Sequence, residues 1–251
     1  MGNILVSDYD RTFYINDDEI IDNINAISKW RCNENYFVIA TGRAYESIKK
    51  EIDKFNIKYD YLIIEHGACI LDNKGNIIKS YIIDDGILKS IKKYFKENKY
   101  DKHIISCENK YTYLDSDRIT RIHIAYTKAE ELKYNFNKFN DIYVNKVNCY
   151  LVEFDLGFEI VSIDTNKSIA IRYLLNVLNI NNKNVFVIGD SINDIPMIKE
   201  FNGYCVENAK DVVKNISSKS FVSVKECVKY IQGCAWFNNF CNQTFFRIYI
   251  D

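Results

Sequence analysis

Three apolar runs in this sequence each end in a cluster of polar residues whose types could carry chemistry. The clusters, in chain order, are Asp8, Asp10 and Thr12; Thr41, Gly42 and Arg43; and Asp190, Ser191, Asn193 and Asp194. A single aspartate after a strand is commonly a turn former or a helix cap. Three clusters at equivalent places favour a shared site, because an open α/β sheet binds ligands at the carboxyl ends of its strands.

The aspartates of these clusters would repel one another if they converged at one edge of a sheet. Neighbouring carboxylates raise each other's pKa and resist joint ionisation. A divalent cation removes this conflict, and carboxylate oxygens suit Mg²⁺, which can share its ligands with a substrate phosphate. The clusters contain neither His nor Cys, which argues against zinc or a softer metal. We therefore expect a magnesium site rather than aspartates that only cap helices.

The apolar runs before the clusters have the character of buried parallel strands. Residues 4–6, 36–40, 61–64 and 185–188 consist almost entirely of Ile, Leu, Val, Phe, Tyr and Ala. Strands that are covered on both faces have this composition. Segments with helical spacing of apolar residues lie between them, so strands and helices alternate along the chain. This alternation predicts an α/β fold with a Rossmann-like parallel sheet.

The alternation is interrupted in the middle of the chain. Residues 69–78 have the pattern of a hairpin with a Gly-containing turn, and the segment that follows indicates two helices and several antiparallel strands. We predict a core domain of residues 1–82 and 159–232, with a smaller α+β domain of residues 83–158 inserted into it. The aromatic-rich residues 233–251 form a C-terminal extension with no clear period and no role that the sequence reveals.

The ordered clusters resemble the motifs of the haloacid dehalogenase (HAD) superfamily, in the form found in its Cof-like phosphatase branch. The matching segments are Asp8-Tyr9-Asp10-Arg11-Thr12 for the first motif, Ala40-Thr41-Gly42-Arg43 for the second, Asn166-Lys167-Ser168 for the third and Gly189-Asp190-Ser191-Ile192-Asn193-Asp194 for the fourth. The resemblance covers most of residues 4–231. It implies a HAD-like core and makes residues 83–158 a cap domain inserted between the second and third motifs.

The resemblance also implies a role for each motif residue. Asp8 would attack the phosphoryl group and become phosphorylated. Asp10 would protonate the leaving oxygen and then deprotonate the attacking water. Thr41 and the amides near it, including Gly42, would hold the phosphoryl oxygens, and Lys167 would neutralise their charge.

The same resemblance implies the metal ligands. Asp8, the Asp10 carbonyl and Asp190 would bind Mg²⁺, and Asp194 would stand behind them and orient the metal waters or the lysine. Asn193 could contact either the phosphate or the metal waters. Arg43 could contact substrate or form a salt bridge on a helix face.

Two positions depart from the pattern of the branch. Arg11 stands where Gly is common, and His66-Gly67-Ala68 replaces the usual Asn-Gly-Ala. The histidine could be a pH-sensitive substrate contact or a structural residue. The roles of both residues stay open at this point.

These features together predict an enzyme, a magnesium-dependent phosphohydrolase that acts on small phosphorylated metabolites such as sugar phosphates or phosphorylated cofactors. A phosphomutase or other phosphotransferase would use the same site, and a regulator that binds phosphate or metal without catalysis is a third reading. The formal net charge of -1 gives no support for a nucleic-acid partner, and no apolar run approaches the length of a membrane span. Eight scattered cysteines and the lack of a signal peptide favour a cytoplasmic protein, which we expect to be a monomer or a small homo-oligomer.

Overall fold

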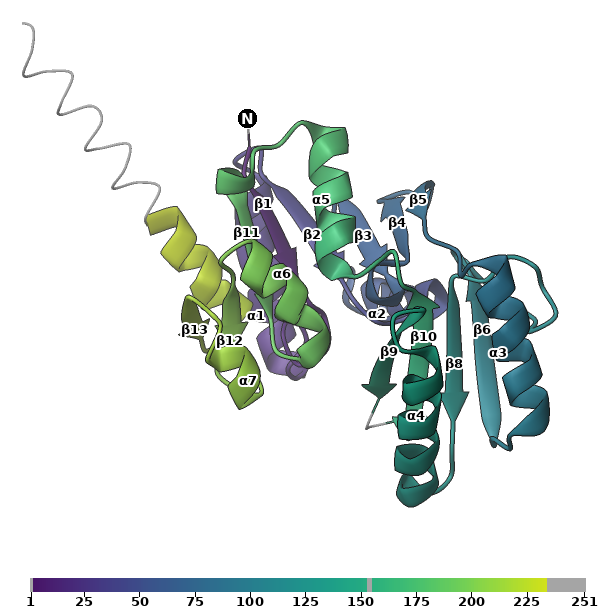
Figure 1. Cartoon of the computed structure of the whole chain (residues 1–251). Coiled ribbons are helices and arrows are strands. Elements are labelled where there is room, and N and C mark those ends of the chain that lie inside the picture. Colours follow the sequence, from purple (N-terminus) through teal and green to yellow (C-terminus); the bar gives the residue numbers. More distant parts are fainter. Residues whose placement is uncertain (1, 153–154, 234–251) are drawn as a thin grey trace, which may run out of the picture.

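The computed structural model describes residues 2–152 and 155–233, which form two β-sheets with helices packed on them (Figure 1). The larger sheet has eight strands in the order β13-β12-β11-β1-β2-β3-β4-β5. The smaller sheet has five strands in the order β7-β6-β8-β10-β9. All but the first residue of the predicted C-terminal extension lie outside the described residues.

The larger sheet contains every strand that precedes a predicted site cluster. Its strands are β1 (Ile4–Ser7), β2 (Tyr36–Ala40), β3 (Tyr61–Ile64), β4 (Cys69–Asp72), β5 (Ile77–Ser80), β11 (Val185–Gly189), β12 (Tyr204–Val206) and β13 (Lys219–Phe221). The strands from β13 to β3 pair in parallel, and β3, β4 and β5 pair antiparallel. The predicted α/β class, its parallel sheet and the hairpin of residues 69–78 are therefore confirmed.

Helices cover both faces of this sheet, which is why its central strands are almost entirely apolar. The helices α1 (Asp17–Arg31) and α2 (Tyr45–Phe55) lie on one face, and α5 (Lys167–Leu178) and α6 (Ile195–Glu200) lie on the other (Figure 1). The short helix α7 (Asp211–Lys214) lies between β12 and β13 in the sequence. Ile4, Leu5 and Val6 of β1 are completely buried. Burial on both faces removes the alternation of polar and apolar residues that a half-exposed strand would show.

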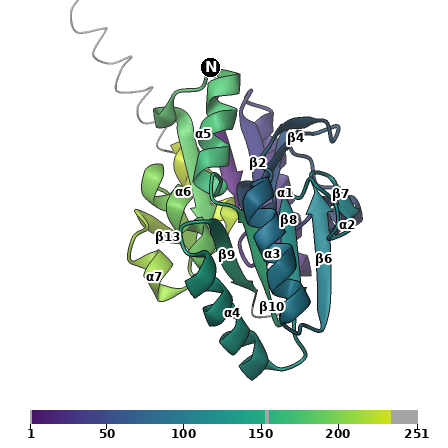
Figure 2. The ribbon, with the colours of Figure 1, turned by 45° about the vertical axis from the view of Figure 1, so that its right-hand side comes forward.

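The smaller sheet is antiparallel throughout and carries helices on one face (Figure 2). Its elements are α3 (Asp85–Glu97), β6 (Lys102–Cys107), β7 (Lys110–Thr112), β8 (Arg121–Ala125), α4 (Ala129–Tyr143), β9 (Val147–Val152) and β10 (Gly157–Ser162). Ile122, Phe158 and Phe139 belong to the apolar cluster between the sheet and these helices. We refer to this unit as the cap.

The predicted boundary at residue 158 falls inside strand β10 and is wrong in position. β10 pairs with β8 and β9 as far as Val161 and Ser162, so residues 159–162 belong to the smaller sheet and not to the core. The cause is the burial of every residue of β10. A strand buried on both faces gives no polar or Gly-rich signal where one sheet ends and the connection to the other begins.

No helix within residues 2–152 and 155–233 has the length and apolar character needed to cross a membrane.

Candidate active site

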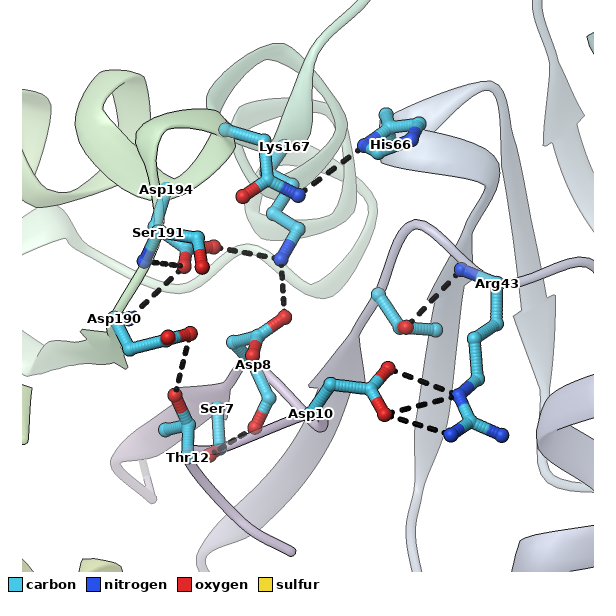
Figure 3. Close-up of polar contacts among 12 residues, drawn as sticks. Ser7, Asp8, Asp10, Thr12, Arg43, His66, Lys167, Asp190, Ser191 and Asp194 are labelled. Carbon is cyan, nitrogen blue, oxygen red and sulfur yellow. Dashed lines mark hydrogen bonds and ion pairs between the residues drawn. The ribbon is translucent and has the colours of Figure 1, made fainter. Parts of the chain in front are cut away.

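The three predicted clusters meet at one edge of the larger sheet (Figure 3). Asp8 directly follows β1 and Asp190 directly follows β11, and these two strands are parallel neighbours with Ser7 opposite Ile188. The hydroxyl of Thr12 donates a hydrogen bond to Asp190 Oδ1 at 3.3 Å. The sequence predicted that these polar residues meet at one edge of the sheet. Parallel pairing of β1 and β11 places the first and fourth motifs side by side there.

Lys167 links the first and fourth motifs through its ammonium group. Its Nζ lies 2.6 Å from Asp8 Oδ1 and 2.6 Å from Asp194 Oδ1, and the side chain is completely buried (Figure 3). Asn166 caps helix α5 and so fixes Lys167 as the first residue of that helix. Burial alone would lower the pKa of Lys167, but the charges of Asp194 and Asp8 outweigh it and raise the pKa, so the amine stays protonated.

Asp194 contacts the backbone of the fourth motif and Lys167 at the same time. Its Oδ2 accepts hydrogen bonds from the backbone amides of Asp190 and Ser191, each at 3.0 Å. Gly189 makes this packing possible, because a Cβ at that position would lie 2.5 Å from Asp194 Cγ. With one oxygen used by backbone amides and the other by Lys167, Asp194 is suited to orient its neighbours.

An acidic cluster of suitable size for a cation lies beside Lys167. Asp8, Asp190 and Asp194 each offer a carboxylate oxygen, and the three atoms lie within 4.8 Å of one another. Asp190 Oδ2 is buried without a hydrogen-bond partner in the described chain, and the charged Arg11 Nε lies 3.5 Å away. Burial and the Asp194 charge raise the pKa of Asp190 to about 6. An all-carboxylate set with an unpartnered oxygen fits Mg²⁺.

Asp8 is buried at the centre of this arrangement. Burial raises its pKa well above the ordinary value, and Lys167 acts in the opposite direction. Lys167 contacts Oδ1, so Oδ2 is not used by that ion pair. The carboxylate is thus held in one orientation with an oxygen left for another partner.

Asp10 and Arg43 form a bidentate ion pair (Figure 3). Arg43 Nε lies 2.9 Å from Asp10 Oδ2, and Nη2 lies 2.7 Å from Oδ1. Arg43 thus pairs with a predicted catalytic residue, and it also lies 3.5 Å from Glu51 on the face of α2. Any proton that Asp10 delivers must come from an oxygen that Arg43 now contacts.

The second-motif loop supplies a buried hydroxyl beside this pair. Thr41 Oγ1 accepts a hydrogen bond from the Arg43 amide at 3.1 Å, while the Thr41 amide is used by Ile63 O at 2.8 Å. The hydroxyl hydrogen of Thr41 can therefore still be donated to a ligand, whereas its amide belongs to the sheet.

Arg11 shows why glycine is common at its position. Its φ is 62°, in the left-handed region that costs a residue with a Cβ about 1–2 kcal/mol. Asn208 compensates, since it accepts a hydrogen bond from Arg11 Nη2 at 3.0 Å and donates one to Arg11 O at 3.1 Å. Arg11 is therefore held at the edge of the acidic cluster.

The sequence analysis missed a group of buried charges on the face of the cap sheet that meets the core. Glu159 of β10 forms an ion pair with Arg121 of β8, lies 3.2 Å from His123 Nδ1 of the same strand, and contacts His66 of the core. Burial would raise the pKa of Glu159, but the Arg121 charge and the two histidine contacts hold it well below its ordinary value. The signal was present in β8, where Arg121 and His123 alternate with isoleucines, and in β10 as one glutamate inside an apolar run.

Glu65 is a second buried acid that the sequence analysis did not single out. Burial raises its pKa to about 7, against the opposing effects of the Arg121 charge and the hydroxyls of Thr120 and Ser106. A folded-state pKa above the unfolded value means that the proton binds more tightly in the folded protein. Protonated Glu65 therefore contributes to the free energy of unfolding. This contribution is complete below about pH 4 and is lost as the pH rises through about 7.

Glu65→Gln is therefore expected to raise the free energy of unfolding by about 1–3 kcal/mol at pH 8 and to change it little at pH 5. Glutamine keeps the shape of the protonated acid and has no proton to lose. Urea denaturation at both pH values measures the effect, with the exposed Glu97→Gln as the matched control. An equal change at pH 5 and pH 8 would contradict the expected ionisation of Glu65.

Comparisons with known proteins agree with this geometry. A family model described as sucrose-6F-phosphate phosphohydrolase matches residues 1–238. A Bacillus subtilis protein named 5-amino-6-(5-phospho-D-ribitylamino)uracil phosphatase is 26% identical over 224 residues, which cover 84% of this chain and 86% of that protein. A phosphoglycolate phosphatase of Methanobrevibacter smithii is 30% identical over 160 residues, or 61% of this chain and 63% of that protein.

Solved structures show the same fold at low sequence identity. A candidate HAD/COF-like hydrolase from Plasmodium vivax superposes with a TM-score of 0.81 at 19% identity, covering 93% of this chain and 96% of that one. A haloacid dehalogenase-like hydrolase from B. subtilis gives a TM-score of 0.75 at 18% identity, with 89% and 96% covered. The likeness includes the cap as well as the core, because nearly the whole of each chain is covered.

Proposed function

This chain belongs to the sucrose-6F-phosphate phosphohydrolase family of haloacid dehalogenase-like phosphatases, and from that premise we propose that it is a Mg²⁺-dependent phosphatase that transfers the phosphoryl group to Asp8. Hydrolysis of phosphoric monoesters is the activity its relatives share. The observation that carries the finer proposal is the buried Asp8 carboxylate, which Lys167 holds by one oxygen at 2.6 Å. A nucleophile restrained in this way is already ordered before it attacks, so the attack costs little further side-chain entropy.

The first chemical step would form a bond from Asp8 Oδ2 to phosphorus and break the bond to the leaving oxygen. Asp10 would give its proton to that oxygen. In the second step a water would attack the same phosphorus, Asp10 would take the water's proton, and Asp8 would leave as a carboxylate. Both steps need Arg43 to release one oxygen of Asp10 from their bidentate pair.

The neighbouring residues would stabilise the charge of the transferring group. Lys167 is a buried cation next to Asp8, and the Thr41 hydroxyl can donate to a phosphoryl oxygen. The carboxylates of Asp8 and Asp190 and the Asp10 carbonyl would hold the cation, with Asp194 fixing the amides of the loop. A bound Mg²⁺ would draw negative charge away from the phosphoryl oxygens.

The substrates we propose are small phosphorylated metabolites, such as sugar phosphates or phosphorylated cofactors. The names of the family and of the B. subtilis relative support this class, since each describes a phosphate ester of a small polyhydroxylated molecule. The cap also contacts the core through His66 and Glu159 close to the site, which favours compact substrates. A phosphomutase would differ only in its product, an isomerised phosphate ester instead of free phosphate.

A screen of phosphorylated metabolites with Mg²⁺, read as released phosphate, tests the function. Turnover is expected to disappear in excess EDTA and to return with added Mg²⁺. Mg²⁺ at about 100 times its Kd should also stabilise the fold by about 2.7 kcal/mol, because it binds only the folded cluster. Asp190→Asn is expected to lose this stabilisation, whereas the exposed Asp117→Asn keeps it. Undiminished phosphate release in EDTA would contradict the metal requirement.

A further inference from the structure

Residues Glu65, His66 and Gly67 adopt left-handed backbone conformations one after another. Their φ values are 54°, 59° and 109°. Each of the two residues with a Cβ bears a cost of about 1–2 kcal/mol. The strain is held by hydrogen bonds from the Glu65 amide to Arg43 O at 3.0 Å and from the His66 amide to Thr41 O at 3.1 Å. Strain that surrounding contacts enforce in this way is characteristic of functional sites.

The result of this conformation is that the His66 ring contacts two catalytic loops and the cap. It packs so closely on Gly42 of the second motif that a Cβ there would lie 2.4 Å from His66 Cε1. It stacks on Tyr150 of β9 with ring centroids 4.0 Å apart and an interplanar angle of 18°. Its Nε2 contacts Glu159 of β10, and its Nδ1 lies 3.2 Å from Nδ2 of Asn193 in the fourth motif.

The partner on the cap decides which ring nitrogen carries the proton. Glu159 is ionised because Arg121 and His123 hold its other oxygen, and an ionised carboxylate can only accept hydrogen bonds. Nε2 must therefore donate. Burial lowers the pKa of His66, against the opposing effect of Glu159, so the ring is neutral. In a neutral imidazole with the proton on Nε2, Nδ1 is an acceptor.

The tautomer of His66 in turn determines the orientation of the side-chain amide of Asn193. Nδ1 as an acceptor requires a donor, so Asn193 must turn its Nδ2 toward the ring, as observed. Its Oδ1 then lies on the other side, buried and without a hydrogen-bond partner in residues 2–152 and 155–233. An unpartnered buried oxygen is costly unless a ligand satisfies it.

We propose that Glu159 of the cap, acting through the tautomer of His66, sets the Asn193 amide so that its carbonyl oxygen faces the reaction site. His66 and Glu159 are then positioning residues, and this role rests on the proposed phosphatase function. An acceptor without a donor does not suit phosphoryl oxygens, which are acceptors themselves. Asn193 Oδ1 would instead accept from a water on the cation or from a hydroxyl of the substrate, so of the two contacts that the sequence left open for this residue the proposal excludes the phosphate.

The tautomer can be measured without any assay of activity. The chain has three histidines, so ¹⁵N-histidine labelling gives few signals, and His66 is assigned by its absence from a His66→Asn sample. At pH 7.5 we expect a protonated Nε2 and an unprotonated Nδ1. A proton on Nδ1, alone or together with one on Nε2, would overturn the proposal. This result stands whether or not the protein proves to be a phosphatase.

Two variants separate the roles of the ring nitrogens in catalysis. The Asn side chain places an acceptor near the position of Nδ1, and Asn is among the residues that best tolerate a positive φ. Gln reaches the position of Nε2 but offers Asn193 no acceptor. His66→Gln is expected to lower kcat by about 10–100-fold with KM little changed, whereas His66→Asn keeps kcat within about threefold.

The exposed cap histidine provides the matched control, since His103→Gln is expected to leave kcat and KM unchanged. Equal losses in His66→Gln and His66→Asn would show a role in packing alone and overturn the proposal, as would a normal kcat in folded His66→Gln. If His66→Gln does not fold, the tautomer of the wild-type protein decides the question.

Discussion

Replacing Asp8 with asparagine is expected to lower phosphate release by about three orders of magnitude or more and to leave the chain folded. Asparagine has the shape of aspartate but cannot form the bond to phosphorus. The fold should tolerate it because burial already disfavours the charged form of Asp8, as its raised pKa shows. Lys167 also keeps its second partner, Asp194, at 2.6 Å.

Released phosphate and far-UV circular dichroism measure the two parts of this expectation. The exposed Asp117→Asn is the matched control for a loss of one negative charge. Mass spectrometry of acid-quenched wild-type enzyme should find one phosphoryl group on the peptide that contains Asp8, and Asp8→Asn should show none. Substantial turnover by Asp8→Asn would rule out the covalent route.

Lys167→Met is expected to have the largest effect on stability, a loss of about 3–5 kcal/mol in the free energy of unfolding at neutral pH, together with loss of activity. The Lys167 amine is completely buried and is the shared partner of Asp8 and Asp194. Methionine matches its length without its charge. The variant leaves the acidic cluster, whose oxygens lie within 4.8 Å of one another, without its buried cation.

Urea denaturation in EDTA measures this loss, because EDTA prevents a metal ion from replacing the missing charge. The exposed Lys133→Met controls for the general effect of a methionine in place of a lysine. A loss below about 1 kcal/mol is typical of a surface ion pair. It would contradict the expectation that the buried Lys167 stabilises the acidic cluster.

The placement of the first and fourth motifs could be predicted from the sequence because it depends on strand ends. The burial of β1 and β11 gives apolar runs, and each run ends where its strand leaves the sheet. Because β1 and β11 are parallel neighbours, Asp8 and Asp190 then lie at the same end of the sheet. The positions of the first and fourth motifs are therefore a consequence of local pattern and one topological rule.

The contacts that cross between elements could not be read in the same way. Nothing local to Arg43 indicates that it pairs with Asp10, and nothing local to His66 indicates a partner at Glu159. Side chains on different elements meet only after both sheets are placed. The positive φ values of Glu65 and His66 are equally hidden, because tertiary contacts impose them.

The position of the cap within the chain has a consequence for folding. Ile4 of β1 pairs with Val185 of β11, so the centre of the larger sheet cannot close until the chain has been made as far as β11. The strands of the cap lie within residues 102–162, so all of their pairings span far less of the sequence than that of β1 with β11. Local contacts of this kind form sooner than distant ones.

The two connections to the cap return to the same place on the core. The Tyr81 amide donates to Ala68 O at 2.8 Å, and the Thr165 hydroxyl donates to Gly67 O at 2.8 Å. A cap that has already folded thus brings the two halves of the core close together. The entropy of loop closure grows with the length of flexible chain between the ends. We therefore expect that a folded cap shortens the flexible chain between β1 and β11 and so speeds their pairing during synthesis.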